Sequence, residues 1–408
     1  MMSAVFAARS PGRVILLEKN EKLGKKIYIT GKGRCNFTNN CERDVLMENI
    51  CTNSRFLYSA FSDFAPSDVI AFFESLGLRC KTERGGRVFP ESDHASDVTA
   101  ALEKEMRRLG VEIRLKTGVK SILTKTREKD GAEAEVCAAG VITDKGEKIP
   151  ADAVIVATGG LSYPSTGSTG DGLKFAGGLG LAVTKLRPSL VPMETLEDDA
   201  ALMQGLSLKN VSIRIRDGKK VLYEDFGEMM FTHFGVTGPL ILSASAKVGS
   251  TLEKRQLSLT IDLKPALDEK KLDERLIREF SSASNRQLKN ILPSLYPSSL
   301  VPVMLKRSSL DGNLPAREVT KEQRRTLVSL TKALPFTLTG TRGFEEAIIT
   351  AGGVNVRGIH PDTMEAKKVK ELYFAGEVLD VDALTGGFNL QIAWATGRSA
   401  GIAAGAGE

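Results

Sequence analysis

The sequence is poor in metal-binding residues. It contains three histidines in 408 residues, and no two of its five cysteines form a CxxC pair. Zinc sites are built from clustered cysteine and histidine ligands, so no metal site is expected. Five scattered cysteines fit a reducing compartment, which predicts a cytoplasmic protein. No apolar run reaches the roughly 20 residues that a membrane helix needs, so we expect a soluble chain with no membrane partner.

The sequence also has only a small excess of positive charge. The net charge is +6, with 42% hydrophobic and 26% charged residues, as in ordinary globular proteins. A mild positive excess suits an anionic ligand such as a dinucleotide and does not require nucleic acid. No basic patch is interleaved with aromatic residues, so an RNA-binding flavoprotein is the less favoured alternative. Salt-dependent retention on RNA would revive that alternative.

The start of a dinucleotide-binding unit is missing as well. Residues 13–18 (RVILLE) are predicted to form a buried parallel strand that ends in Glu18. In a βαβ nucleotide-binding unit such an acid binds the ribose hydroxyls, and a GxGxxG turn lies about twenty residues before it. Only seventeen residues precede Glu18, and residues 1–8 are predicted to be the helix that follows the glycines. We interpret this as a start assigned at an internal methionine; a truncated, cofactor-free remnant is the alternative.

The most informative stretch is near the C-terminus. Residues 372–375 (LYFA) predict a strand that stops at Gly376-Glu377, and an acidic turn with Asp380 follows. Gly386-Gly387 then precede a helix that opens at Asn389 and Leu390. A carboxylate can bind a ribityl or ribose hydroxyl, and free N–H groups at a helix start can face an electron-rich oxygen. This pattern therefore predicts a flavin nucleotide site.

Two glycine-rich segments extend the predicted site. Residues 30–39 (TGKGRCNFTN) offer glycines for close backbone approach, a cation at Arg34, and hydrogen-bonding side chains at Asn36 and Thr38. Residues 157–172 (ATGGLSYPSTGSTGDG) follow a predicted buried strand at 153–158 and precede a helix at 173–179. Together they predict a surface for phosphate or isoalloxazine groups.

Catalytic residues are hard to assign from the sequence. His233, in the segment FGEMMFTHFGVTGP, is the one candidate acid–base group, and a structural histidine in a barrel turn is the competing interpretation. Cys35 and Cys41 are separated by five residues, whereas disulfide-reductase flavoproteins use four, so we expect Cys35 to be a free thiol near the flavin. The catalytic residues are otherwise unknown.

The pattern along the chain predicts an α/β protein with insertions. Strands and helices alternate to about residue 180, short strands follow, and a polar helical region leads back to strands. We expect a nucleotide-binding domain in two segments, a small barrel with a late return strand, and a helical subdomain between them. The expected bounds are 1–191 and 345–408 for the nucleotide domain, 192–266 and 333–344 for the barrel, and 267–332 for the helices.

These segments together resemble a known family. LLEKNEKLGKKIYITGKGRCNFTN, ATGGLSYPSTGSTGDG, GEMMFTHFGVTGP and FAGEVLDVDALTGGFNLQIAWATG are similar, in this order, to blocks of the BaiN-like, or aminoacetone-oxidase-like, family of bacterial NAD(P)/FAD-dependent oxidoreductases. The resemblance spans nearly the whole chain. It implies a Rossmann-type FAD domain in two segments, a translation-factor-like β-barrel and a small helical unit. The family's GGGPAG-like loop is the one block without a counterpart.

The resemblance also implies which residues bind FAD. Glu18, with Lys19 beside it, would bind the adenosine ribose, and Val119 would lie beside the adenine. A helix start at Gly386 and Gly387 would place N–H groups near the flavin pyrimidine edge, where hydride arrival puts negative charge. The other implied FAD contacts are Gly31, Gly33, Arg34, Cys35, Asn36, Thr38, Thr158, Gly159, Gly160, Gly376, Glu377, Asp380, Asn389 and Leu390.

The expected function is that of a bacterial FAD-dependent oxidoreductase. The sequence has no second dinucleotide fingerprint, so NAD(P)H is expected to dock transiently and reduce the flavin, which then passes electrons to a small organic acceptor or to oxygen. One alternative is a fumarate-reductase-like enzyme that reduces activated C=C bonds, although the arginine and histidine clamp of such enzymes is not evident. The other is a flavin-binding protein without turnover. The oligomeric state is open.

The first prediction concerns the flavin itself. We expect visible flavin absorption bands in purified protein expressed from an upstream-extended start, because the missing loop would cradle the FAD pyrophosphate. Protein expressed from Met1 should lack these bands. Bands in both forms would mean that FAD binds without the loop, and bands in neither would contradict the flavoprotein assignment.

Overall fold

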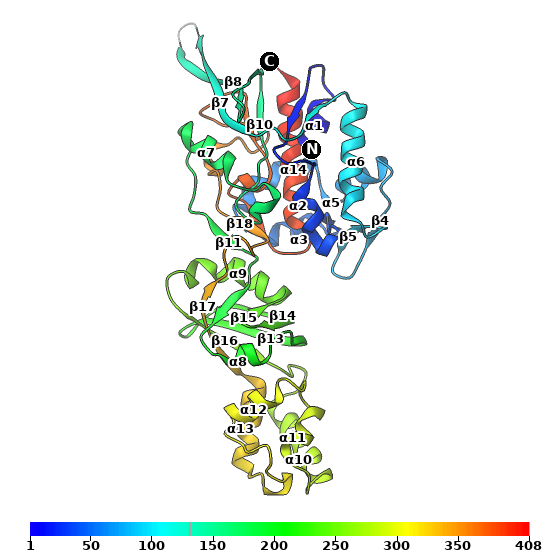
Figure 1. Cartoon of the computed structure of the whole chain (residues 1–408), viewed down its shortest axis with the longest axis vertical. Helices are drawn as coiled ribbons and strands as arrows, with labels where there is room; N and C mark the ends of the chain where they lie inside the picture. Colours follow the sequence, from blue (N-terminus) through cyan, green and yellow to red (C-terminus); the bar gives the residue numbers. More distant parts are fainter. Residues whose placement is uncertain (130–131, 408) are drawn as a thin grey trace. The chain divides into compact units, whose positions relative to one another are not determined.

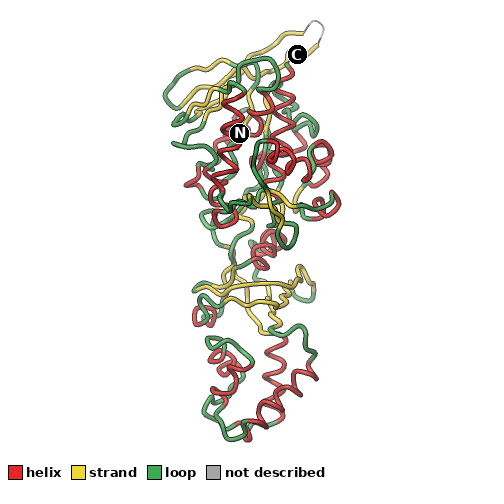
Figure 2. Tube along the Cα trace, turned by 90° about the vertical axis from the view of Figure 1, so that its right-hand side faces the viewer, coloured by secondary structure: helices red, strands yellow, loops and turns green. Residues whose placement is uncertain are grey.

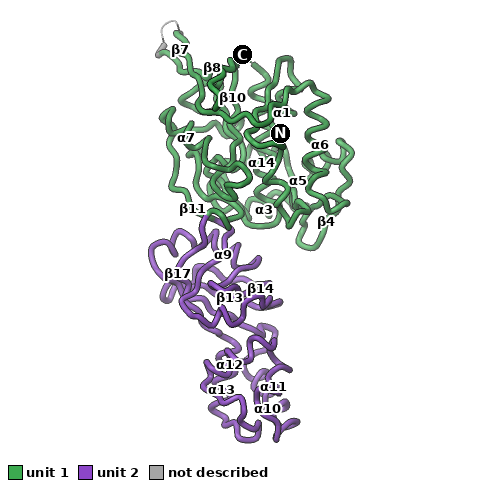
Figure 3. The backbone as a smooth tube through the Cα atoms, viewed as in Figure 1, with its two compact units in different colours: residues 1–188, 344–408 green, residues 189–343 purple. Residues whose placement is uncertain are grey.

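The computed structural model describes residues 1–129 and 132–407, which fold into two compact units. Unit 1 comprises residues 1–188 and 344–408, and unit 2 comprises residues 189–343 (Figure 3). Unit 1 is therefore built from both ends of the sequence. Strand β11 (Arg187–Ser189) lies where the chain passes from unit 1 to unit 2.

Unit 1 mixes short strands with helices. Its helices are α1 (Met2–Ala7), α2 (Lys25–Ile29), α3 (Arg43–Glu48), α4 (Tyr58–Asp63), α5 (Pro66–Ser75), α6 (Ala95–Arg108), α7 (Asp171–Gly178) and α14 (Phe388–Ala406), with 3₁₀ turns η1 (Thr30–Gly33), η2 (Ser54–Leu57), η3 (Pro164–Thr166), η6 (Val356–Gly358) and η7 (Gly376–Val378). Its strands are β1 (Ile15–Leu17), β2 (Thr38–Asn39), β3 (Ile50–Thr52), β4 (Cys80–Thr82), β5 (Arg87–Pro90), β6 (Glu112–Arg114), β7 (Val119–Lys129), β8 (Ala132–Thr143), β9 (Lys148–Pro150), β10 (Val154–Val156), β18 (Ile349–Ala351), β19 (Leu372–Phe374) and β20 (Asp382–Ala383).

Two parallel strand pairs bring distant segments together. β1 pairs with β6, and β10 pairs with β19 in the register Val154 to Leu372 and Val156 to Phe374. The second pair joins the two sequence segments of unit 1. The expectation that β1 and β10 are buried strands is corrected here: all of β1 and most of β10 are only half-buried, because each belongs to a two-stranded sheet. The antiparallel β7–β8 hairpin is much longer, as Figure 2 shows.

Helix α14 forms the centre of unit 1, and α1 lies against it (Figure 1). The absence of a side chain at Gly401 allows this contact, because a Cβ atom added there would lie 2.5 Å from the Ser3 carbonyl oxygen. At the other end of the helix, the Trp394 indole N–H donates to the Phe37 carbonyl oxygen at 2.8 Å, and Phe73 meets the Trp394 ring edge-on with centroids 5.4 Å apart. The helix is thus held by close backbone approach and buried aromatic contacts.

Unit 2 contains a closed six-stranded barrel and a group of helices. The barrel order is β12–β15–β14–β13–β16–β17, and β17 returns to it after the helices. Alternate residues such as Ile213 and Ile215 of β13 are buried, which is the period-two pattern of a barrel interior. The elements are β12 (Met193–Thr195), α8 (Asp199–Leu202), β13 (Ser207–Asp217), β14 (Lys220–Thr232), β15 (Gly235–Thr237), α9 (Pro239–Leu252), β16 (Leu257–Asp262), α10 (Glu269–Ser282), α11 (Leu288–Ile291), η4 (Leu292–Ser294), α12 (Val301–Arg307), η5 (Ala316–Glu318), α13 (Lys321–Lys332) and β17 (Leu334–Thr341).

The α/β fold class with an inserted barrel and helices is confirmed. The sequence pattern predicts short strands after residue 180, whereas β13 and β14 have 11 and 13 residues, because cross-strand pairing in the barrel continues them through polar residues that carry no hydrophobic alternation. Within residues 1–129 and 132–407, no helix combines the length and apolar character that crossing a bilayer would require.

The contact between α14 and α1 gives a stability prediction. Gly401→Ala should lower the free energy of unfolding by about 1–3 kcal/mol, because its new methyl group would meet the α1 backbone, which cannot easily move. Gly177→Ala in α7 is the matched control: nothing lies within 4 Å of its Cβ position, so it should change stability by less than about 1 kcal/mol. Denaturant unfolding of both variants tests this, and equal effects would contradict it.

Candidate functional site

The end of β1 meets the glycine-rich segment that precedes α7. Glu18 Oε1 accepts hydrogen bonds from the backbone N–H and the side-chain amide of Asn20, both at 2.8 Å. The Lys19 ammonium donates to Thr169 Oγ1 at 2.5 Å and to Asp171 Oδ2 at 2.7 Å. The Glu18 carboxylate retains acceptor positions for a ligand hydroxyl. The contacts of Lys19 with Thr169 and Asp171 hold the loop before α7 beside this carboxylate.

The segment after β10 is packed tightly. The Thr158 hydroxyl accepts the Gly172 N–H at 3.1 Å, which ties the strand end to the first turn of α7. A Cβ atom at Gly160 would lie only 2.5 Å from Thr350 Oγ1. The neighbouring Gly159 has a left-handed φ of 71°. The sequence predicts this segment as a cofactor surface. In the structure it contacts Lys19, which follows β1, and Thr350, which belongs to the C-terminal segment of unit 1.

Glu377 lies at the centre of a polar cluster that sequence patterns only partly revealed. Its Oε1 accepts from the Ser162 hydroxyl at 2.6 Å and from the Thr350 N–H at 2.9 Å, and its Oε2 accepts from the Lys26 ammonium at 2.5 Å. Ser162 and Thr350 are fully buried. Lys26 and Thr350 are not among the predicted site residues, because Lys26 lies in a lysine-rich stretch that does not distinguish it from its neighbours and Thr350 lies in no motif.

The 31–38 segment is held in an unusual backbone conformation. Gly31, Lys32 and Cys35 all have left-handed φ angles between 57° and 59°. A non-glycine residue in this region costs free energy that the surrounding structure must supply. Asn36 Oδ1 is buried without a hydrogen-bond partner among the described residues. A buried acceptor without a donor is what a bound ligand's N–H or O–H would satisfy.

Arg34 is used within the protein. Its guanidinium pairs with Glu83 and with Asp93 at 2.6 Å, and it lies over the Phe89 ring at 4.2 Å. Lys81 joins the same network through Asp93 at 2.6 Å. The hydrogen bonds to Glu83 and then Asp93 raise the pKa of the Arg34 guanidinium. The predicted cation of the loop is therefore tied to the β4–β5 hairpin.

The start of α14 is shaped by close contact with β2. Gly387 has a φ of 97°, and a Cβ atom there would lie 2.3 Å from the Thr38 carbonyl oxygen, so only glycine fits. The Thr38 hydroxyl donates to Gln391 Oε1 at 2.6 Å, and the Gln391 amide donates to the Phe64 carbonyl oxygen. Gln391 is fully buried and was missed by sequence analysis, because a glutamine in a helix carries no motif of its own.

The remaining predicted residues around this helix have separate local roles. The Asn389 side chain accepts from the Ala383 N–H at 2.9 Å and donates to its carbonyl oxygen at 2.8 Å, so it fixes the preceding turn. Leu390 follows it in the first helical turn, where backbone N–H groups have no helical partner. Gly376 donates its N–H to the Thr396 hydroxyl at 3.0 Å. Asp380 is buried, and burial raises the pKa of its carboxyl group.

Two predicted residues lie away from these contacts. Val119 begins β7 and pairs with Thr143 of β8. His233 belongs to unit 2, in the exposed turn between β14 and β15, where its ring meets Phe234 edge-on with centroids 5.0 Å apart. The other predicted residues belong to unit 1, as Val119 does, whereas the candidate acid–base group belongs to unit 2.

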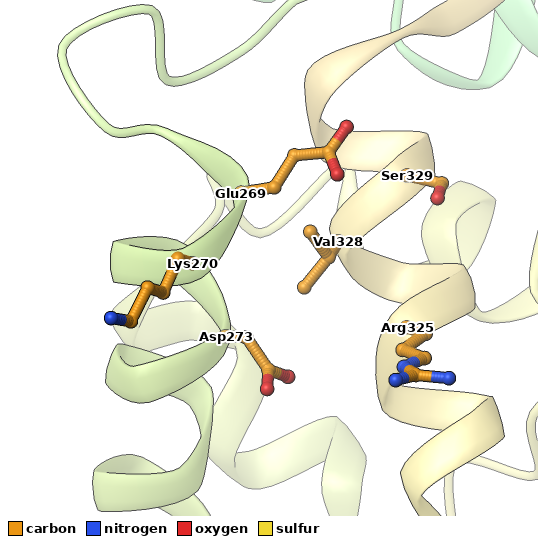
Figure 4. A pocket seen from close by; sticks show the side chains of 6 residues that line it. All are labelled: Glu269, Lys270, Asp273, Arg325, Val328 and Ser329. Atoms are coloured by element: carbon orange, nitrogen blue, oxygen red, sulfur yellow. The ribbon is translucent and has the colours of Figure 1, made fainter.

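A surface hollow is found elsewhere, between α10 and α13 of unit 2 (Figure 4). Its wall contains charged groups of both signs, and Asp273 within it already pairs with Arg324 at 2.5 Å. No sequence-predicted site residue lines it. The lining residues are Glu269, Lys270, Asp273, Arg325, Val328 and Ser329.

The donor set of unit 1 fits FAD. Glu18 and Glu377 offer carboxylate acceptors for hydroxyl groups, the unpartnered Asn36 oxygen offers a further acceptor, and the first turn of α14 offers N–H groups for an electron-rich oxygen. Glycines at 160 and 387 let backbone approach closely where a side chain would block it. Residues from both sequence segments contribute to this surface.

Cys35 gives a reactivity prediction. Its thiol is fully buried, and burial raises its pKa from 9.0 to about 12. The contribution of the protonated Cys35 thiol to the free energy of unfolding is complete below pH 9 and is lost as the pH rises toward 12. The reason is that the Cys35 thiol of the unfolded chain ionises at a lower pH than the buried thiol does. At pH 9 the folded protein should carry about five-hundredfold less Cys35 thiolate than the unfolded chain and resist alkylation accordingly. Peptide mapping after brief alkylation measures this, and equal labelling of both forms would contradict it.

Comparison with known proteins places the chain in a family. The HI0933-like protein Rossmann domain matches residues 1–403. The chain is 34% identical over 410 aligned positions to the 3-dehydro-bile acid delta(4,6)-reductase of Clostridium scindens, covering 99% of this chain and 96% of that protein. It is 30% identical over 399 positions to the ribosomal RNA dihydrouridine synthase of Haemophilus influenzae, covering 97% and 93%.

A solved structure gives the same fold. The 3-ketosteroid delta1-dehydrogenase of Sterolibacterium denitrificans, in complex with 1,4-androstadiene-3,17-dione, has a TM-score of 0.53 and 13% identity, covering 100% of this chain and 97% of that one. At this identity the likeness concerns the fold alone. Because the family match spans nearly the whole chain, the flavoprotein resemblance is confirmed: this protein belongs to the HI0933-like family of Rossmann-domain, FAD-binding oxidoreductases.

Proposed function

We propose that this protein is an FAD-dependent reductase of a C=C bond conjugated to a carbonyl group, with NAD(P)H as the electron source. The observation that carries the proposal is the convergence on Glu377 of segments from both halves of unit 1, which supports a built cofactor site. The reaction type is supported by what the two relatives' names share. A 3-dehydro-bile acid with 4,6 double bonds and a uridine both contain a C=C bond conjugated to a carbonyl.

The residues of unit 1 have separate proposed roles. Glu18 accepts the ribose hydroxyls, Val119 lies beside the adenine, and residues 158–160 contact the nucleotide. Glu377 meets the pyrophosphate or ribityl chain, and its carboxylate retains an acceptor position for a ribityl hydroxyl. The N–H groups at the start of α14 stabilise negative charge at the flavin pyrimidine edge. Bound FAD would supply hydride transfer between the nicotinamide and the substrate.

The remaining predicted contacts fall into two groups. Lys19 and Arg34 act by holding the loops that carry the site, because both are engaged in ion pairs. Gly376 and Asp380 shape the turn around Glu377. The residues proposed to line the flavin are Gly31, Gly33, Cys35, Asn36, Thr38, Gly386, Gly387, Asn389 and Leu390.

The substrate reaction balances with one nicotinamide per double bond. NAD(P)H loses a hydride and becomes NAD(P)⁺, and the C=C bond gains that hydride and one proton. No residue of unit 1 is assigned as the proton donor, and His233 is the acid–base candidate that the sequence alone offers. A small carbonyl-containing molecule in the cytoplasm is the proposed substrate, and reduction of uridine in RNA is the second candidate, which the H. influenzae relative favours.

The proposal predicts a mass change. FAD-loaded protein incubated anaerobically with NADH or NADPH and a steroid 4-en-3-one should oxidise the nicotinamide and yield a product heavier by two hydrogens. The matched control is the same steroid already saturated at that bond, which should give no turnover.

Other outcomes separate the alternatives. Saturation of uridine in RNA, with no change in the steroid, would select the second candidate. Nicotinamide oxidation that requires oxygen and leaves both substrates unchanged would contradict a C=C reductase and favour an oxidase.

A further inference from the structure

The Lys26 side chain lies inside the proposed cofactor site. Its ammonium contacts Glu377 Oε2 and Ser162 Oγ, each at 2.5 Å. The Lys26 side chain is 24% exposed and that of Glu377 is 11% exposed. The interaction therefore links the loop after β10 and turn η7, which the sequence predicts as parts of the site, to helix α2, which it does not.

The Lys26 ammonium is the charged partner of the Glu377 carboxylate. An ionised carboxylate accepts about four hydrogen bonds, and three are used by Lys26, Ser162 and the Thr350 N–H. Of these donors, only Lys26 carries charge. Without it, this largely buried carboxylate would have no charged partner, and an unpaired buried charge is costly.

The same charge would repel a dinucleotide. FAD carries a pyrophosphate, and an uncompensated carboxylate beside it would oppose binding in a medium that screens charge less than water does. We propose that Lys26 is a positioning residue of the cofactor site: it neutralises and orients Glu377, so that this carboxylate can accept a hydroxyl of the cofactor without repelling its phosphates. This inference rests on the proposed function, which places FAD at Glu377.

The neighbouring lysines do not share this position. Lys25 belongs to the same helix, but it pairs at 3.1 Å with Glu21, whose side chain is 55% exposed. Lys19 pairs with Asp171, and both side chains are about 30% exposed. Exposed ion pairs contribute little because water screens them. The Lys26–Glu377 pair is the less exposed arrangement, and Lys25 offers a control that removes the same charge from the same helix.

The test uses as wild type the upstream-extended form of the first prediction, which is the form expected to bind FAD, and four variants of it: Lys26→Met, Lys26→Arg, the double variant Lys26→Met with Glu377→Gln, and Lys25→Met as the control. The dissociation constant of FAD is measured by titrating deflavinated protein and following flavin fluorescence, at low and high salt. Thermal unfolding of each cofactor-free variant is measured in parallel.

Lys26→Met should raise the dissociation constant by about tenfold or more, and Lys26→Arg and Lys25→Met should stay within about threefold of the wild type. The double variant should bind FAD several-fold more tightly than Lys26→Met, since no unpaired charge remains. Added salt should strengthen binding to Lys26→Met by screening the repulsion. A residue that only supports the fold would not produce that salt dependence.

Two failures are distinguishable. If the wild type shows no saturable FAD binding, the proposed function itself is overturned. If the wild type binds FAD and Lys26→Met binds equally well, or if the double variant restores nothing, only the role of Lys26 is overturned. Should Lys26→Met fail to fold, the double variant still decides: FAD binding near the wild-type level supports compensation, and lost binding in a folded protein contradicts it.

Discussion

The structure of unit 1 depends on close backbone approach along helix α14. At its start Gly387 lies against the Thr38 carbonyl, and farther along Gly401 lies against the Ser3 carbonyl, in both cases closer than any side chain would permit. Between these points the Trp394 indole and the Gln391 amide bind main-chain oxygens of other segments. A helix from the end of the chain can therefore organise strands and loops from its beginning, because buried polar groups fix its position as firmly as apolar contacts do.

Charge organises the surface that this scaffold presents. Lys19, Lys26 and Arg34 each bind carboxylates from segments far away in the sequence, so the loops of the site are fixed by one another. Removing one partner of such a partly buried pair leaves the other charge without compensation. These pairs therefore favour the one arrangement of the loops in which both partners meet. For the proposed anionic cofactor, positive charge in these loops would also lower the electrostatic cost of binding.

The family relationship narrows the chemistry more than the fold does. Rossmann-type flavoprotein folds support many reactions, so a fold similarity with a TM-score of 0.53 selects no substrate. The two relatives near 30% identity are named for very different substrates, a bile acid and a ribosomal RNA. Their shared feature is a C=C bond next to a carbonyl, whose reduction places negative charge on the carbonyl side. Selection between such substrates depends on groups around the flavin.

The sequence alone determined the α/β class, the inserted barrel and helices, and the family, because hydrophobic periodicity and glycine-rich turns are local properties. It also identified the segments around Glu18, Gly160, Glu377 and Gly387 as candidates for one site. Only the tertiary structure decided which side chains meet. Lys26, Thr350 and Gln391 have no local signal, since their roles arise from partners 27 to 353 residues away. For Arg34 the sequence predicted a contact with the ligand, because the residue lies in a glycine-rich loop. In the structure its guanidinium forms ion pairs with Glu83 and Asp93, since ion pairing depends on proximity in space.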